Sequence, residues 1–268
     1  MKKFKGKALY KPTGKAAEYA SWAVNFYTGC SNDCEYCYCK RGVLSHVWDS
    51  KPHLKKCFKD EKHAFDVFME ELYLNREELR KDGIMFSFTT DPMLDETLSL
   101  TLFCTEFALM NDVPVKILTK CAYWVFDKAM QWYLSYSFVN KHKDKLSIGF
   151  TLTGVDELEP NASSNSQRIE GMKELHKLGF KTWASMEPVI NLTTTLQIIQ
   201  QTKNFCDVYK VGLRSGVKKD YYDPKEMAYF YQSLRLLSRN RKIYLKDSVL
   251  DYFNINRVDL PQTFINSK

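Results

Sequence analysis

Long hydrophobic runs are missing from this sequence of 268 residues. Nowhere do eighteen apolar residues follow one another, and the lysines near its start (Lys2, Lys3, Lys5 and Lys7) are not followed by an apolar segment. The sequence therefore supports neither a membrane-spanning helix nor a signal peptide, and we expect a cytoplasmic protein. No stretch rich in proline, glycine or serine interrupts the chain, so we expect no flexible linker between domains.

The sequence also has only a small excess of one charge and few cysteines. Lysine and arginine number 39 against 32 aspartates and glutamates, a formal net charge of +7 that favours anionic partners without selecting one. Eight cysteines are too few for a small disulfide-stabilised domain. Four of them are clustered, at Cys30, Cys34, Cys37 and Cys39, and clustered thiols in a reducing compartment more often bind metal or take part in chemistry.

Short runs of β-branched and aromatic residues recur along the chain and alternate with helical patterns. The runs cover residues 24–27, 84–89, 115–119, 147–152, 181–186, 207–212 and, less clearly, 242–245. After the first run, successive starts are 31, 32, 34 and 26 residues apart, which is the rhythm of βα units. Ser164 and Gln167 form a capping-box pattern before one helical stretch, and Gly179 stands where that helix would end.

This pattern predicts an α/β protein built as a partial (β/α)6 TIM-type barrel, with parallel strands and outer helices. We expect an N-terminal extension over residues 1–22, the barrel core over 23–215, and a C-terminal helical and strand extension over 216–268 that packs on the barrel. The N-terminal segment or the C-terminal tail would close the barrel. In such folds the chemistry lies at the carboxyl ends of the strands, so the residues that follow each run are the functional candidates.

The cysteine cluster follows the first run directly. Cys30, Cys34 and Cys37 have the spacing C-x3-C-x2-C, and three thiolates on one short loop can converge on a single inorganic centre. Structural zinc would need a fourth ligand, which Cys39 or Cys57 could supply, although Cys39 is too near Cys37 for easy joint ligation of one ion. A four-iron cluster held by three thiolates, with one iron open to substrate or cofactor, is the other interpretation.

The motif C-x3-C-x-aromatic-C, with Tyr36 as the aromatic residue, resembles the signature of the radical SAM superfamily. The segments at 88–92, 117–120, 149–153, 158–168 and 186–190 resemble the ordered motifs of its spore photoproduct lyase branch, and the similarity runs from about Tyr10 to Ile190. The resemblance implies a [4Fe-4S] cluster and S-adenosylmethionine (SAM) as cofactors. One electron from the cluster would cleave SAM to a 5′-deoxyadenosyl radical that abstracts hydrogen from a substrate.

The resemblance also implies roles for individual residues. Cys30, Cys34 and Cys37 would hold the cluster, and Tyr36 would pack near the adenine of SAM. The remaining cofactor contacts would be Thr90 and Asp91 with the amino group, Lys120 and Arg168 with the carboxylate, and Thr151 with the ribose or carboxylate. A zwitterionic sulfonium ligand does need an acidic acceptor and a basic donor in a partly desolvated site.

One departure concerns the hydrogen donor. Where the photoproduct lyases carry a hydrogen-donating cysteine, this sequence has Phe88, whose ring has no S–H bond. Repair of thymine dimers by that mechanism is therefore not implied. Cys121, beside Lys120, and Cys39, beside the cluster motif, are the alternative catalytic candidates.

Three hypotheses follow from these observations. The first is a radical SAM enzyme of unassigned substrate, with nucleic acid among the candidates, that takes its electron from a donor such as flavodoxin or ferredoxin. The second is a zinc-stabilised nucleic-acid-binding protein without catalysis, which would use the basic surface and the aromatic residues. The third is a scaffold that binds the cluster and SAM without turnover. Residues after 209, which include Arg214, Ser215 and Tyr221, either line a substrate channel or cover the barrel.

Overall fold

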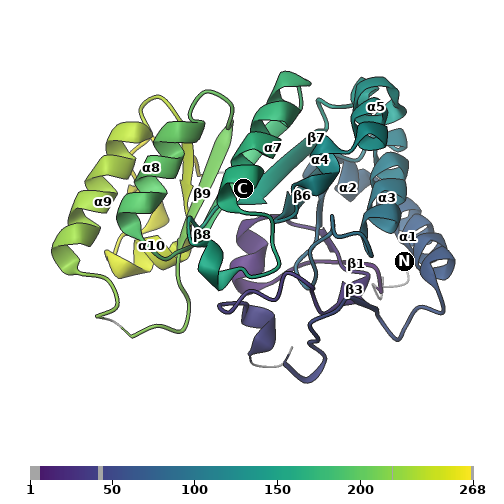
Figure 1. Cartoon of the computed structure of the whole chain (residues 1–268), viewed down its shortest axis with the longest axis horizontal. Helices are drawn as coiled ribbons and strands as arrows, with labels where there is room; N and C mark the ends of the chain where they lie inside the picture. The colour runs from purple at the N-terminus through teal and green to yellow at the C-terminus, as the bar shows by residue number, and fades with distance from the viewer. Residues whose placement is uncertain (1–6, 42–44, 219, 267–268) are drawn as a thin grey trace.

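A single curved sheet of eight strands organises the chain in this computed structural model, which describes residues 7–41, 45–218 and 220–266 (Figure 1). The strands lie in the order β1-β2-β5-β6-β7-β8-β9-β10; β1 is antiparallel to β2, and every later neighbour is parallel. Their bounds are β1 Leu9–Tyr10, β2 Ala23–Val24, β5 Ile84–Phe86, β6 Val115–Thr119, β7 Leu146–Thr151, β8 Lys181–Val189, β9 Val208–Leu213 and β10 Lys242–Leu245. A separate pair is formed by β3 (Tyr27–Thr28) and β4 (His53–Leu54).

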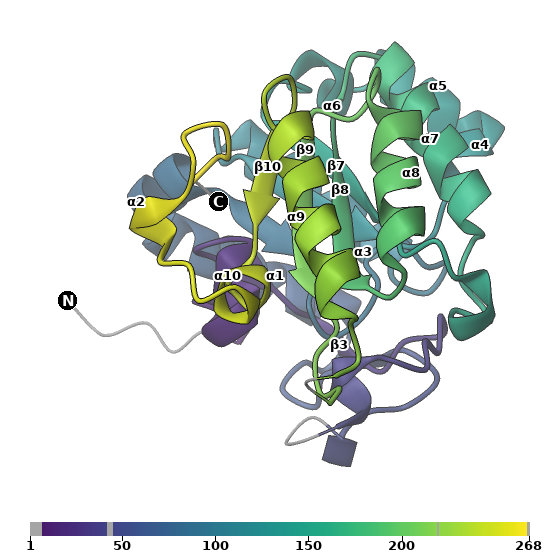
Figure 2. The ribbon, with the colours of Figure 1, turned by 90° about the vertical axis from the view of Figure 1, so that its left-hand side faces the viewer.

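Helices fill the connections between the parallel strands and cover the outer face of the sheet; Figure 2 shows α7, α8 and α9 there. The α-helices are α1 Glu61–Leu74, α2 Arg76–Asp82, α3 Leu98–Met110, α4 Tyr123–Phe126, α5 Lys128–Tyr136, α6 Phe138–Lys141, α7 Asn165–Lys177, α8 Leu192–Thr202, α9 Pro224–Leu237 and α10 Asp247–Tyr252. Short 3-10 helices are η1 Gly14–Glu18, η2 Tyr38–Lys40, η4 Asp156–Leu158 and η5 Arg257–Asp259. Among the described residues, no helix combines the length and the apolar character needed to cross a membrane.

Local sequence signals explain several of these elements. Ser164 and Gln167 form the capping box expected at the start of α7, and Gly179 has a φ of 85° just beyond its end. Gly149 in β7 leaves room for the ring of Trp183 in β8, because a Cβ at Gly149 would lie 2.2 Å from that ring. A glycine inside a strand therefore marks close packing between two neighbouring strands.

The α/β partial barrel with parallel strands and outer helices is confirmed, with differences at its ends. The first expected strand is divided between β2 and β3, and β10 adds a seventh parallel strand to the expected six. The register pairs Thr119 with Phe150 and Thr151 with Ser185. The ends of β6, β7 and β8 therefore meet at one edge, as parallel strands require.

The N-terminal segment spans the gap between the two outer strands of the sheet. β1 is the outer strand at one edge of the sheet, where it pairs with β2. At the other edge, Glu18 at the end of η1 accepts a hydrogen bond of 2.7 Å from the backbone N–H of Asp247, which follows β10. Lys210 in β9 donates to the carbonyl of Glu18 at 3.0 Å. The expected closure is therefore made by the N-terminal segment, and it places Tyr19 inside the barrel.

Candidate functional site

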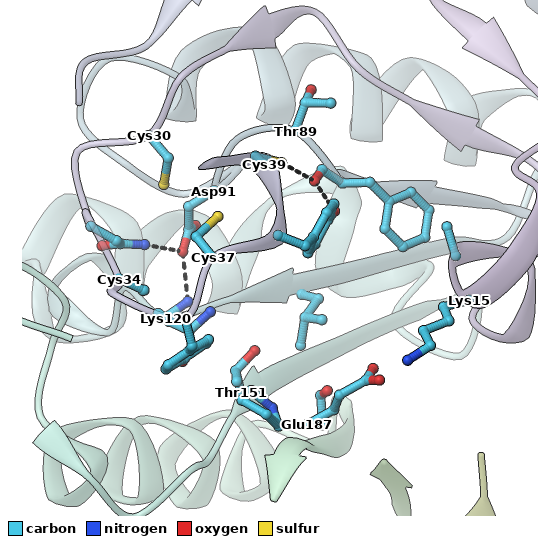
Figure 3. Close-up of a pocket in the computed structure, with 18 of the residues that line it drawn as sticks. Lys15, Cys30, Cys34, Cys37, Cys39, Thr89, Asp91, Lys120, Thr151 and Glu187 are labelled. Atoms are coloured by element: carbon cyan, nitrogen blue, oxygen red, sulfur yellow. Dashed lines mark hydrogen bonds between the residues drawn. The ribbon is translucent and has the colours of Figure 1, made fainter. Parts of the chain in front are cut away.

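A cavity of about 450 Å³ lies at the carboxyl ends of the parallel strands. This volume is within the usual range for a small-molecule or cofactor site. Figure 3 shows Cys30, Cys34, Cys37, Asp91 and Lys120 gathered on one side of it. Its walls also contain most of the other residues expected at the site, namely Tyr36, Cys39, Thr90 and Thr151.

The three motif cysteines lie on one loop, residues 29–41, which we call the cysteine loop. Gly29 begins the loop with a φ of 81°, and a Cβ there would lie 2.1 Å from the carbonyl oxygen of Lys51. Cys30 N–H donates to the carbonyl of Asp49 at 3.0 Å, and Glu35 N–H donates to that of Leu158 at 3.0 Å. The loop is thus fixed by backbone contacts to two distant segments, and only glycine fits at its start.

Asp91 is buried, and its carboxylate joins three segments at the cavity wall. Oδ1 accepts from Thr119 Oγ1 at 2.6 Å and from the backbone of Met93 at 3.0 Å. Oδ2 accepts from the Lys120 backbone at 2.6 Å and from Asn32 Nδ2 at 2.8 Å. Asp91 therefore fixes the cysteine loop against the ends of β5 and β6. Asn32, whose role the sequence motifs did not reveal, supplies the contact from the loop.

Lys120 is the basic side chain on the wall at this end of the cavity. Its Nζ lies 5.6 Å from the centre of the Tyr36 ring. Burial alone would lower the pKa of Lys120, but its electrostatic interactions with Cys34 and Glu159 outweigh this effect, and the pKa is raised. Lys120 is therefore the cation available to an acidic group of a ligand bound here.

Arg168 is not brought to the cavity. It is fully buried, with Nη1 donating to the carbonyl of Thr151 at 2.6 Å and Nε to that of Ser163 at 2.8 Å. Its Nη2 pairs with Glu159, which also accepts the hydroxyl of Tyr36. Arg168 thus holds Tyr36 and Thr151 in place from behind the wall. Glu159 is a buried acid that sequence reasoning did not single out.

Thr90 and Thr151 are both buried and line the cavity. Thr90 Oγ1 donates to the carbonyl of Gly29 at 2.7 Å and so adds a further contact to the cysteine loop. Thr151 is the last residue of β7, beside Ser185 in β8. Their contacts to a cofactor stay predictions of the resemblance.

The cavity also has a second polar end, on the side away from the motif cysteines, where Figure 3 shows Lys15 and Glu187. The hydroxyl of Tyr19 is 2.7 Å from both Glu187 Oε2 and Ser185 Oγ, and buried Lys246 pairs with Glu187. A Cβ at Gly212 would lie 2.8 Å from Glu187 Oε1, so this glycine makes room for the pair. The sequence motifs do not reveal Tyr19 or Lys246.

The two alternative catalytic cysteines differ in position. Cys39 is buried on the cavity wall, and its thiol lies 3.6 Å from the carbonyl oxygen of Phe88. A sulfur from the cysteine loop therefore lies next to the backbone of Phe88. Cys121 is buried and is not among the residues that line the cavity.

The chemistry of the donor set fits an iron–sulfur cluster. All three motif cysteines are free thiols that line the same end of the cavity. Burial raises the pKa of Cys30 to about 12 and also raises that of Cys34, whereas a hydrogen bond from Cys39 lowers the pKa of Cys37. Iron binds thiolates, so loading releases protons from this end of the cavity. Within the described ranges, no three Cys, His, Asp or Glu side chains already surround one point as a single metal ion requires.

Comparison with known sequences finds one distant relative among curated proteins. In an alignment of 222 positions that covers 77% of this chain and 74% of the other protein, the chain is 23% identical to the uncharacterized protein MJ0683 of Methanocaldococcus jannaschii. No family model matches the sequence.

Comparison with solved structures identifies the class of fold. A spore photoproduct lyase variant matches with a TM-score of 0.64 at 13% identity, over 87% of this chain and 78% of its own. A second variant, with bound AdoMet and dinucleoside spore photoproduct, gives 0.55 at 14% identity over 83% and 63%. SuiB of Streptococcus suis bound to S-adenosylmethionine gives 0.52 at 12% identity over 84% and 52%. The chain therefore has the partial-barrel fold of the radical SAM enzymes, and the resemblance to the spore photoproduct lyase branch is confirmed in its fold.

Proposed function

We propose that this protein is a radical SAM enzyme that binds a [4Fe-4S] cluster through Cys30, Cys34 and Cys37. The observation that carries the proposal is the position of the three thiols. They lie on one rigid loop at one end of a cavity, and the carboxyl ends of the parallel strands place Lys120 and Thr151 in the same walls. When both cofactors are bound, one electron cleaves SAM to methionine and a 5′-deoxyadenosyl radical, which abstracts hydrogen from the substrate.

The residues of the chain bind and orient the cofactor. Lys120 is the donor for the carboxylate of SAM, Tyr36 packs near its adenine, and Thr151 contacts its ribose or carboxylate. Thr90 and Asp91 lie beside its amino group; because four donors already occupy the Asp91 carboxylate, this acid acts mainly by fixing the cysteine loop. Arg168 acts through Thr151 and Glu159, which it holds behind the wall.

Two further roles belong to the proposal. Cys39, on the cavity wall next to Phe88, is the thiol placed to return a hydrogen atom to a substrate radical. The electron comes from a small donor protein such as flavodoxin or ferredoxin. The net charge of +7 is compatible with nucleic acid as a substrate but does not select it.

The test is anaerobic reconstitution with iron and sulfide. We expect close to four irons per chain and formation of 5′-deoxyadenosine from SAM with a strong reductant. Substitution of Cys30, Cys34 or Cys37 by alanine should abolish both, whereas Cys57→Ala, at an exposed cysteine far from the motif in sequence, should leave both unchanged.

Either of two results would contradict the proposal and favour one of the alternative functions. One zinc per chain, no iron and salt-dependent binding to nucleic acid would indicate the zinc-stabilised binding protein. Full iron and bound SAM without 5′-deoxyadenosine would indicate a scaffold that binds the cofactors without turnover.

A further inference from the structure

Two cations line the mouth of the cavity and a third lies near the loop that carries one of them, from segments far apart in the sequence. Lys15 comes from η1, Arg214 follows β9, and both line the cavity. Arg41 ends the cysteine loop, and its Nη1 lies 3.2 Å from where a Cβ at Gly216 would be. The absence of a side chain at Gly216 thus lets Arg41 come close to the loop that carries Arg214.

This loop is held in place at the mouth. The backbone N–H of Arg214 donates to the hydroxyl of Tyr222 at 2.9 Å, and that hydroxyl donates to the carbonyl of Val189 at the end of β8. Lys15 Nζ donates to Ser215 Oγ at 2.6 Å and so connects the N-terminal segment to the loop. The loop backbone and the Lys15 side chain are therefore positioned before any ligand arrives, and Arg214 Nη1 also lies 3.4 Å from the hydroxyl of Tyr221, which lowers the entropy cost of binding.

The charges of the three cations are not balanced nearby. Within the described ranges, none of Lys15, Arg41 and Arg214 has a carboxylate within 4.0 Å. The acids behind them, Glu187 and Glu18, are both within 3.5 Å of Lys246 Nζ and so balance that buried charge. Like charges brought together at a half-enclosed site repel one another, and an anion removes that repulsion.

We propose that the mouth of the cavity binds an oxyanion of the substrate, a phosphate or a carboxylate, through Lys15, Arg41, Arg214 and the hydroxyl of Ser215. This inference rests on the proposed function, because it assigns this end of the cavity to the substrate and the cysteine-loop end to SAM. Arg presents a planar fork of donors that matches both kinds of oxyanion, and Lys adds a compact charge. The uncharged part of the substrate lies against Tyr19 and Phe88, whose rings are 6.0 Å apart.

The test uses protein loaded with cluster and SAM, and two pairs of probes that differ only in charge. The first pair is thymidylyl-thymidine and its neutral methylphosphonate analogue. The second is N-acetyl-glycyl-glycine and its C-terminal amide. We expect at least one anionic probe to bind in equilibrium dialysis about tenfold more tightly than its neutral partner. Its binding should also weaken with added salt, since the site is open to solvent.

Lys15→Ala, Arg41→Ala and Arg214→Ala should each weaken that binding about tenfold, whereas Lys81→Ala, at an exposed position on α2, should not. Preference for the phosphodiester, the carboxylate or both supports the oxyanion site and identifies the source of the group. Equal binding of charged and neutral probes, or variants that bind as the wild type does, overturns it. Iron content and 5′-deoxyadenosine are measured on the same wild-type samples, so a failed oxyanion site in an active enzyme is distinguished from a failed proposed function.

Discussion

The side-chain amide of Asn32 donates a hydrogen bond of 2.8 Å to the carboxylate of Asp91. This bond connects the loop that carries the three motif cysteines to the end of β5. Since Asp91 also accepts from Thr119 and from the Lys120 backbone, a single buried acid fixes the relative positions of the loop and two strand ends. The position of the three thiols relative to Thr119 and Lys120 therefore depends on a residue that need not take part in the chemistry.

Asp91→Asn should destabilise the protein despite the similar shape of the two side chains. All four partners of Asp91 are donors, and an amide would face some of them with its own N–H groups. We expect a loss of about 2–4 kcal/mol in the free energy of unfolding, measured by urea denaturation, and a lower iron content. Asn32→Ala should cost about 1–2 kcal/mol. The matched control is Asn204→Ala at an exposed position, and a loss of equal size there would contradict the explanation.

Cys39→Ala should show whether the fourth cysteine of the cysteine loop has a different role from Cys30, Cys34 and Cys37. If Cys30, Cys34 and Cys37 are the ligands, this variant keeps the iron content of the wild type after anaerobic reconstitution, whereas Cys34→Ala does not. The measurement is iron and sulfide per chain together with the absorbance of the cluster. A joint loss of iron in both variants would show that Cys39 is itself a ligand.

Lys246→Met should be strongly destabilising, because it leaves the partly buried Glu187 near Glu18 without its cation, although Glu18 keeps Arg257 at 3.7 Å. Removing one partner of a buried pair costs about 3–5 kcal/mol. Glu187→Gln in the Lys246→Met background should recover part of that loss. A double-mutant cycle from urea unfolding measures the coupling, and strictly additive losses would show that the two residues do not interact.

Two glycine variants should have opposite effects. Gly149→Ala places a methyl group 2.2 Å from the ring of Trp183 and should cost about 1–3 kcal/mol. Gly171→Ala in α7 meets its neighbours at an ordinary 3.4 Å and should stabilise the helix by about 0.5–1 kcal/mol. Thermal unfolding of both variants is the measurement, and equal melting temperatures would contradict the packing argument.

The sequence was most informative about features that depend on residues close together in the chain, such as the ends of the strands and the spacing of the cysteines. Parallel strands end at one edge, so residues such as Asp91, Lys120 and Thr151 could be assigned to one site from their positions after three successive runs. The spacing of the cysteines predicted that they share a loop, and the structure places all three at one end of the cavity.

The sequence was least informative where contacts are long-range. Tyr19 and Lys246 reach the cavity from opposite ends of the chain, and no local pattern reveals that η1 would lie beside β10. Arg168 stands at a motif position that suggests a contact with the ligand. Its guanidinium instead pairs with the buried acid Glu159 and lies behind the cavity wall. A charged side chain's direction depends on which opposite charge the fold buries beside it, and motif position alone does not specify that.

The bond between Glu18 and the backbone of Asp247 also has a consequence for biosynthesis. The two residues of this contact are 229 positions apart, so Asp247 is synthesised long after Glu18. This wall of the cavity can therefore form only after residue 247 has left the ribosome.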